Sequence, residues 1–331
     1  MHLELNSDLQ KIEFILLNFT GILDVLANTL LIYLVLYRSS NMQSFRFYLL
    51  YLQLDTLAVD VFLTFFMKPI PIFPVIGGYT TGFLFTYFQI SSHLQMTIVM
   101  GLMALQECAI FTAFIRKHQS IASIDLKRVL RTSTYWSVIV SVHVVGMISV
   151  VLFYFADISR EAEINWIKRN LPELLDPLSK LQGLEIYDPN QNILILYSLI
   201  GLLILNILFF IAIFAFSFDI FWIINHHKPG ISSSVSAQNL RKHQAIFRSL
   251  LAQFSVLGLC FLPVTAVLVF LIFEIPDIQV LSAAMVCTFS FHSFLGSVVL
   301  MATYTPYRKI IIGFWSKPKL VKVVDSNGFI R

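Results

Sequence analysis

The chain has 331 residues, of which 57% are hydrophobic and only 13% are charged. Soluble domains carry about 25% charged residues, and here the apolar residues are gathered into long runs. These features exclude a soluble globular protein and predict an all-α membrane protein. The formal net charge of +4 comes from basic residues spread along the ends of the apolar runs. Since no base-stacking aromatic module accompanies them, we expect no nucleic-acid partner.

Seven runs are long enough for the ~20 residues that cross a bilayer, and their continuous apolarity favours helices over barrel strands. They cover residues 14–37, 47–67, 82–115, 134–156, 191–223, 246–273 and 279–302. We therefore predict a seven-transmembrane helix bundle over residues 14–302. Residues 1–13 are the expected extracellular N-terminus, and residues 303–331 the expected cytosolic tail.

The basic residues predict the orientation of this bundle. Segments on one side of the predicted membrane, including the tail, hold 17 Lys and Arg residues, and segments on the other side hold 6, which accounts for all 23. Cytosolic loops carry the excess of Lys and Arg in membrane proteins. The tail is therefore predicted to be cytosolic and the N-terminus to lie outside.

Several acids interrupt the apolar runs, and such residues usually face other helices or a wet cavity. Asp24 and Asn28 are four residues apart and so share a helical face. They are expected either to form hydrogen bonds within the bundle, which we favour, or to serve an ion or proton site. Asp55 and Asp60 are five residues apart and cannot form a paired-carboxylate site on their own. A cation site between Asp24 and either of them stays open.

Polar residues in two spans are candidates for contact with a ligand. In the third predicted span, Gln89 and His93 lie four residues apart, where one helical face would present both to a molecule entering from outside. Glu107 follows in the inner half of the same span, and His292 lies in the seventh. Hydrogen bonding between helices is the alternative interpretation of the first pair.

Two outer loops are expected to shape the mouth of a cavity. Residues 68–79 hold three prolines and two glycines, which predicts a short, stiff loop. Residues 157–190 form the longest polar segment and have the length of a lid. Neither loop contains cysteine, so no disulfide can pin this lid, and we expect it to be mobile or held by packing.

Five segments together resemble the nematode serpentine chemoreceptors of serpentine receptor class I. They are Phe45–Leu50, Lys68–Pro74, Arg116–Gln119, Ser249–Phe254 and Pro306–Arg308. The resemblance implies a chemosensory receptor of the plasma membrane, in sensory-neuron cilia. It also implies a small-molecule ligand and signalling to a heterotrimeric G protein.

The inner ends of the predicted helices are basic. The resemblance implies that these basic residues face the G protein, and they are Arg116, Lys117, Arg241, Lys242 and Arg308. After the seventh span, apolar residues fall on one face beside basic ones, which predicts an amphipathic helix lying in the membrane interface. The anchoring residues of that helix are Ile310, Ile311, Phe314 and Trp315.

Other functions have weaker support. The chain contains no Gly-x-Ser-x-Gly, Gly-x-Gly-Asp or His-Glu-x-x-His sequence, so an intramembrane enzyme is not expected. We expect no cofactor and no metal centre, because Cys108, Cys260 and Cys287 all lie within spans and no His-Cys cluster occurs. A ligand-gated ion channel subunit and a small-solute transporter remain as alternatives, although an odd number of spans without a repeat disfavours the transporter.

Overall fold

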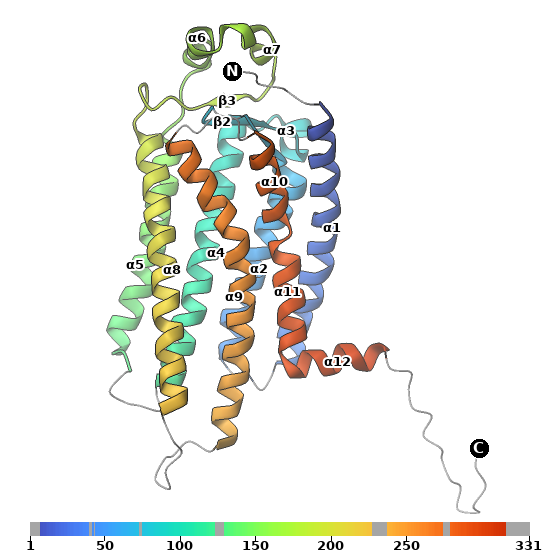
Figure 1. The fold of residues 1–331 in the computed structure, drawn as a ribbon, viewed down its shortest axis with the longest axis vertical. Helices are drawn as coiled ribbons and strands as arrows, with labels where there is room; N and C mark the ends of the chain where they lie inside the picture. Colours follow the sequence, from blue (N-terminus) through green and yellow to red (C-terminus); the bar gives the residue numbers. More distant parts are fainter. Residues whose placement is uncertain are drawn as a thin grey trace, which may run out of the picture.

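The computed structural model describes residues 7–39, 42, 44–72, 75–122, 129–226, 237–273 and 279–315. Long, roughly parallel helices form one elongated bundle (Figure 1). The bundle consists of α1 (Ser7–Arg38), α2 (Phe45–Val61) with a π-helical extension (Phe62–Met67), α4 (Ser92–Ala122), α5 (Thr132–Tyr154), α8 (Leu194–His226), α9 (Ala237–Ile272), and the consecutive α10 (Gln279–Ser290) and α11 (His292–Thr303).

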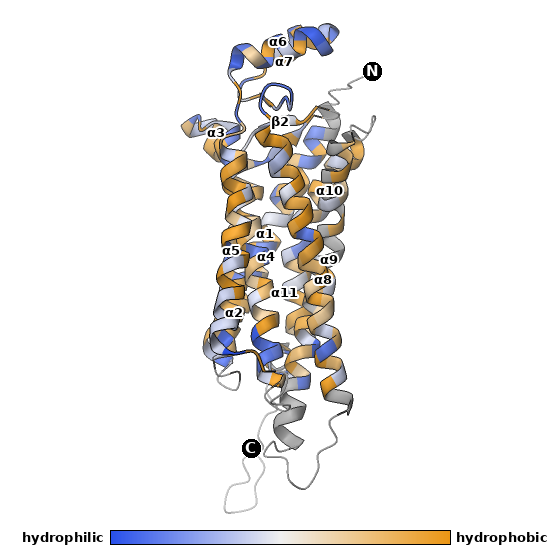
Figure 2. Cartoon of the chain, turned by 90° about the vertical axis from the view of Figure 1, so that its left-hand side faces the viewer, coloured by the Kyte–Doolittle hydropathy of each residue, from blue (hydrophilic) through white to orange (hydrophobic). Residues whose placement is uncertain are grey.

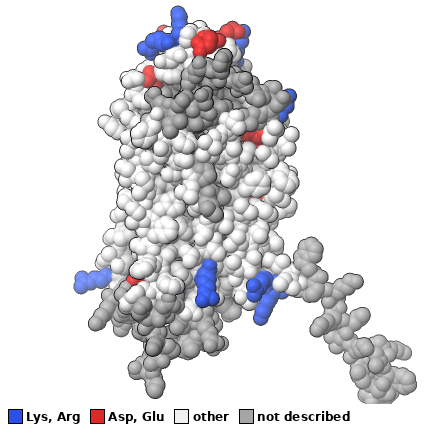
Figure 3. Space-filling model, in the orientation of Figure 1, with Lys and Arg blue, Asp and Glu red and all other residues white. Residues whose placement is uncertain are grey.

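The lengths and surfaces of these helices fit a membrane. In the described part of the chain, six helical segments are long and apolar enough to span one, and the 36-residue α9 lies beside α8 and α11. The outward faces of α5 and α8 expose large apolar side chains such as Val144, Ile148 and Ile211, and both helices are predominantly apolar in Figure 2. On the face seen in Figure 3, the Lys and Arg side chains lie near the two ends of the bundle. Lipid is the solvent that suits this surface.

Several boundaries differ from the sequence-based prediction, among them that of the sixth span, whose helix begins at Ala237 instead of residue 246. The first helix begins at Ser7, earlier than predicted. The predicted run 82–115 is divided into a short helix, α3 (Phe83–Phe88), and α4. The predicted run 279–302 is divided at Phe291 into α10 and α11. Apolar composition therefore predicted the spans but not the breaks, because a break between two apolar helices leaves the composition unchanged.

One end of the bundle, which we call the sheet end, carries a three-stranded antiparallel sheet. It contains β1 (Pro69–Pro71), β2 (Gly77–Thr80) and β3 (Glu185–Ile186), in the order β1-β2-β3. The middle strand needs its glycines, because a Cβ on Gly77 would collide with the Glu185 carbonyl oxygen. The two predicted outer loops are thus paired into one sheet.

The segment 157–190 forms a lid over this sheet, with α6 (Arg160–Asn170), a 3₁₀ turn (Pro172–Leu174) and α7 (Leu175–Ser179) above β3 (Figure 1). The Ser159 hydroxyl caps α6 by accepting a hydrogen bond from the Ala162 N–H. Acids in the first turn of α6 and bases in its last complement the helix dipole. The local sequence therefore accounts for α6 as a helix.

Packing and hydrogen bonds hold the lid in place without a disulfide. A cluster of buried apolar side chains joins the lid to the β1–β2 loop, and its members are Ile72, Val75, Ile167, Leu171, Leu178, Leu184 and Ile186. The Glu163 carboxylate accepts hydrogen bonds from the Ile186 N–H, at 2.8 Å, and from Arg160, at 2.9 Å. Burial raises the pKa of Glu163, and the Arg160 guanidinium opposes that shift. Of the two alternatives, the structure shows a lid held by packing.

The opposite end, which we call the tail end, carries α12 (Thr305–Trp315). This helix follows α11 directly and runs sideways from the bundle (Figure 1). The fully buried Tyr307 is hydrogen-bonded to the hydroxyl of Ser39, which joins the start of α12 to the end of α1. The predicted short helix after the seventh span is therefore present.

Candidate ligand-binding site

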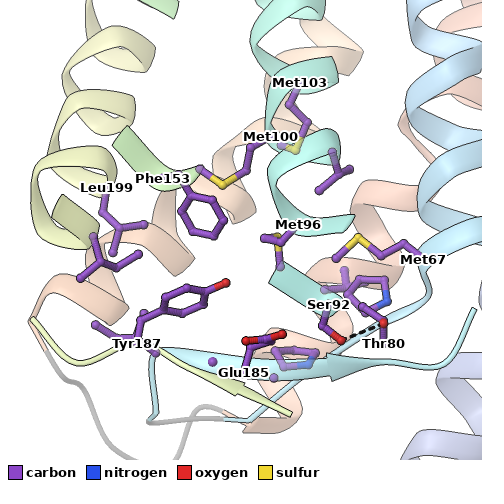
Figure 4. Close-up of a pocket in the computed structure, with 18 of the residues that line it drawn as sticks. Met67, Thr80, Ser92, Met96, Met100, Met103, Phe153, Glu185, Tyr187 and Leu199 are labelled. Carbon is purple, nitrogen blue, oxygen red and sulfur yellow. Dashed lines mark hydrogen bonds between the residues drawn. The ribbon is translucent and has the colours of Figure 1, made fainter. Parts of the chain in front are cut away.

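A cavity of about 290 Å³ lies beneath the sheet, and we call it the sheet-end cavity. Its walls come from α4, α5, α8 and α10, and its roof from the sheet. Most lining side chains are apolar, and four are methionines that lie around the space in Figure 4: Met67, Met96, Met100 and Met103. Methionine is flexible and polarizable, so it adapts to ligands of varied shape. A mainly apolar cavity with a few polar groups is the usual form of a small-molecule site.

Polar groups gather where the roof meets α4. The Thr80 and Ser92 hydroxyls are 2.9 Å apart (Figure 4), and Ser92 donates to the Gly183 carbonyl oxygen at 2.6 Å. The Glu185 carboxylate, on β3, accepts a hydrogen bond from the His93 backbone N–H at 3.3 Å. Burial, with a smaller contribution from the nearby Glu163, raises the pKa of Glu185 to about 7. These contacts fasten the roof to the start of α4.

His93 lies behind the cavity wall. Its Nε2 is 3.0 Å from the Tyr154 carbonyl oxygen, which can only accept, so Nε2 donates there. Nδ1 then accepts from the Tyr187 hydroxyl at 2.9 Å. The ring also stacks on Phe153 with centroids 5.3 Å apart. Because Tyr187 and Phe153 line the cavity, His93 holds two wall residues in position. The hydrogen bond from His93 on α4 to Tyr154 on α5 is of the interhelical kind that was the alternative to direct ligand contact.

Gln89 is not on the helical face that was predicted. It ends α3 with a left-handed backbone (φ 53°) and is exposed, before α4 begins at Ser92. The prediction of a shared face with His93 was wrong because it assumed one continuous helix from 82 to 115. Gln89 is not among the residues that line the cavity.

The floor of the cavity holds a buried carboxyl group and an amide. Glu107 on α4 and Asn206 on α8 both line the space and are each 7% exposed. The Asn206 Nδ2 donates to Glu107 Oε1 at 2.7 Å. Glu107 was predicted to lie in the third span without an assigned role in ligand binding, and Asn206 was not predicted as a site residue. An acid within an apolar run was the available signal.

His292 lies among buried polar groups and does not line the cavity. Its Nδ1 donates to the Phe289 carbonyl oxygen at 2.7 Å, and its Nε2 is 2.9 Å from the Gln106 amide nitrogen. Gln106 also donates to the Thr56 hydroxyl on α2 at 3.0 Å. His292 is fully buried, so these contacts join α2, α4 and α11 in the interior of the bundle.

Asp24 and Asn28 tie α1 to α11. Asp24 accepts a hydrogen bond from the Phe294 N–H at 2.8 Å, and Asn28 accepts one from the Ser297 hydroxyl at 3.0 Å. The Asn28 amide also donates to Ser293. The expectation of hydrogen bonds within the bundle is therefore confirmed. Among the described residues, no group of three or more His, Cys, Asp and Glu is arranged to hold a metal ion.

The basic residues of the tail end differ in exposure. Arg116 is partly exposed, donates to the Ser44 hydroxyl at 3.1 Å and lies 5.7 Å from the ring of Tyr48. Arg308 on α12 is exposed. Lys117 is only 2% exposed, and its ammonium lies over Phe45. The position of Lys117 on α4 turns its side chain into the bundle, and its contact with a partner stays a prediction.

The remaining predicted residues of the tail end are only partly described. Ile310 and Ile311 are half-buried and pack against the main apolar core. The side chains of Arg241, Lys242, Phe314 and Trp315 lie outside the described part of the chain. Their predicted roles stay predictions.

Comparisons with known proteins agree with this architecture. A family model described as serpentine type 7TM GPCR chemoreceptor Sri matches residues 12–311. The crystal structure of squid rhodopsin is similar, with a TM-score of 0.60 and 12% identity over 92% of this chain and 86% of the rhodopsin chain. At that identity, the likeness shows a shared fold. No curated protein matches the sequence.

Proposed function

Because the chain belongs to the Sri family of serpentine seven-transmembrane chemoreceptors, we propose that the sheet-end cavity binds the chemical stimulus of this receptor. Family membership makes the protein a multi-pass, G-protein-coupled chemosensory receptor, as the sequence resemblance implied. The observation that carries the proposal is an apolar cavity of about 290 Å³ beneath a packed lid. Concave, mainly apolar sites of this kind suit small molecules.

The proposal includes an orientation and a cellular site. The sheet end and the N-terminus face outside, and the tail end faces the cytosol, as the distribution of Lys and Arg indicates. The apolar belt supports a membrane location, and the family's chemosensory role supports our proposal of the plasma membrane of a sensory-neuron cilium. Arg116 and Arg308 are accessible at the tail end, and we expect them to contact a heterotrimeric G protein.

Signalling is proposed to work by a shift between two arrangements of the bundle. Helix α4 carries cavity residues near its start and Arg116 near its end. A ligand that binds one arrangement more tightly stabilises it in proportion to that difference in affinity. The same shift would change the exposure of the tail end, including that of Lys117.

Filling the cavity tests this assignment. Met100→Trp places a larger side chain in the cavity and is expected to abolish responses to active compounds while surface expression is kept. The control is Ile98→Phe, because Ile98 is on the same helix but 39% exposed, and this variant should respond like the parent. Cells expressing each variant are screened with a chemical panel and read by a G-protein reporter and by membrane current.

Two outcomes of this screen would contradict the proposal. An unchanged dose response in Met100→Trp would show that the ligand binds elsewhere. A membrane current that persists when G proteins are disabled would favour the ion-channel alternative.

A further inference from the structure

From the floor of the sheet-end cavity, we infer that the ligand is a small apolar amine whose ammonium group binds between Glu107 and Asn206. This inference rests on the proposed function, since it assigns chemistry to the ligand of the same cavity. The polar floor is expected to determine which functional group the ligand carries, because the walls are mainly apolar and discriminate little between functional groups. A few placed polar groups fix orientation in such sites.

The floor presents hydrogen-bond acceptors. Among the described residues, the hydrogen bond to the Glu107 carboxyl comes from Asn206 Nδ2, at 2.7 Å. The other polar atom of that amide, Asn206 Oδ1, is buried and has no hydrogen-bond partner. No Lys, Arg or His in the described part of the chain forms an ion pair with Glu107. A buried acceptor without a donor costs stability, so the floor lacks a donor that a ligand can supply.

An ammonium group supplies both a hydrogen-bond donor and a positive charge. A buried carboxyl group is costly to ionise without a counter-charge, and a cation placed beside it offsets that cost. An ammonium also has several N–H donors, so it can donate to the Glu107 carboxylate and to Asn206 Oδ1 together. A hydroxyl group has one donor and brings no charge, and a carboxylate would repel Glu107. The chemistry of the floor therefore favours an amine over an alcohol or an acid.

The rest of the cavity defines the other part of the ligand. Apolar side chains, including Met96, Met100, Met103 and Leu199, lie around the space next to the sheet, which Figure 4 draws at the bottom of the view. The volume of about 290 Å³ is at the lower end of the ~300–1,000 Å³ range of ligand pockets. A short hydrocarbon chain or a single ring fits this description, with the amino group at one end.

A matched series of probes tests the inference on the full-length protein in lipid nanodiscs. The probes are n-hexylamine, n-hexanol and hexanoate, which share one hydrocarbon chain, and their affinities are measured by the shift in thermal midpoint. We expect n-hexylamine to bind most tightly to the parent protein. Glu107→Gln, which keeps the shape but removes the charge, is expected to weaken n-hexylamine about tenfold or more, as for a broken buried charge pair, and to leave n-hexanol within about twofold.

Comparison variants separate this inference from the proposed function. Glu185→Gln changes the other carboxyl that lines the cavity, at its roof, and the preference for amine over alcohol should survive this change. A preference lost in Glu185→Gln but kept in Glu107→Gln would overturn the inference, as would equal binding of amine and alcohol by the parent. Where either of these two results overturns the amine inference but Met100→Trp blocks binding of every probe, the cavity is still the binding site. Binding of every probe by Met100→Trp would remove the proposed function together with the inference.

Discussion

At the scale of single residues, Glu185 shows how one carboxyl links the lid to the helices. Its backbone pairs with β2, and its side chain accepts the His93 N–H at the start of α4. Burial beneath the sheet raises its pKa from 4.5 to about 7, with Glu163 adding to the shift. An ionised Glu185 is thus less favourable in the folded protein than in the unfolded chain.

This shift predicts a pH dependence of stability. Between pH 4.5 and about 7, the folded protein keeps a proton on Glu185 that the unfolded chain has lost. The free energy of unfolding therefore falls as pH rises through this window. In Glu185→Gln this contribution is absent, so the difference in thermal midpoint between parent and variant should change in favour of the variant from pH 4.5 to 7.5. Parallel curves for the two proteins would contradict the assignment, since Glu163 titrates in both.

At the scale of elements, the closure of the cavity depends on the contact between β2 and β3. Gly77 lies opposite Ile186 in the register, and its Cα is so close to β3 that a side chain would strike the Glu185 carbonyl oxygen. This is backbone against backbone, and backbone cannot move aside as a flexible side chain can. The pairing takes the place of a disulfide between the lid and the bundle.

Gly77→Val is therefore expected to separate the two strands and loosen the lid. Amide hydrogen exchange should increase at Tyr187, which donates its backbone N–H to Ile76 at 2.8 Å, and responses to active compounds should weaken. The control is Gly313→Ala on α12, where a Cβ meets nothing within 4 Å. Equal protection of the lid in Gly77→Val and in the control would show that the strand contact does not close the cavity.

At the scale of the whole molecule, the charge distribution and the fold agree on which helix ends lie together. The ends that carry Arg38, Arg116 and Arg308 gather at the tail end, while the lid with Arg160 lies at the sheet end (Figures 1 and 3). The bundle is therefore basic at one end and mixed in charge at the other. The larger number of Lys and Arg belongs on the cytosolic side.

An epitope tag at each terminus tests this orientation. On intact cells, an antibody should reach the N-terminal tag, and it should reach the C-terminal tag only after the membrane is permeabilised. Staining is measured by flow cytometry, with a cytosolic protein as the control for membrane integrity. Access to the C-terminal tag on intact cells would reverse the proposed direction of signalling.

The sequence by itself determined the class, the approximate spans, the helix after the seventh span and the family, because each follows from runs of residues that are continuous in the chain. It also favoured Asp24 and Asn28 as internal hydrogen-bonding groups, since polar side chains in lipid need partners. Only the tertiary structure decided which polar residues reach the cavity. Whether Glu107 meets Asn206, or Lys117 turns inward, depends on the rotation of each helix about its axis and on breaks such as the one before Ser92. Those are set by packing between distant segments, which a nearly uniform apolar pattern does not encode.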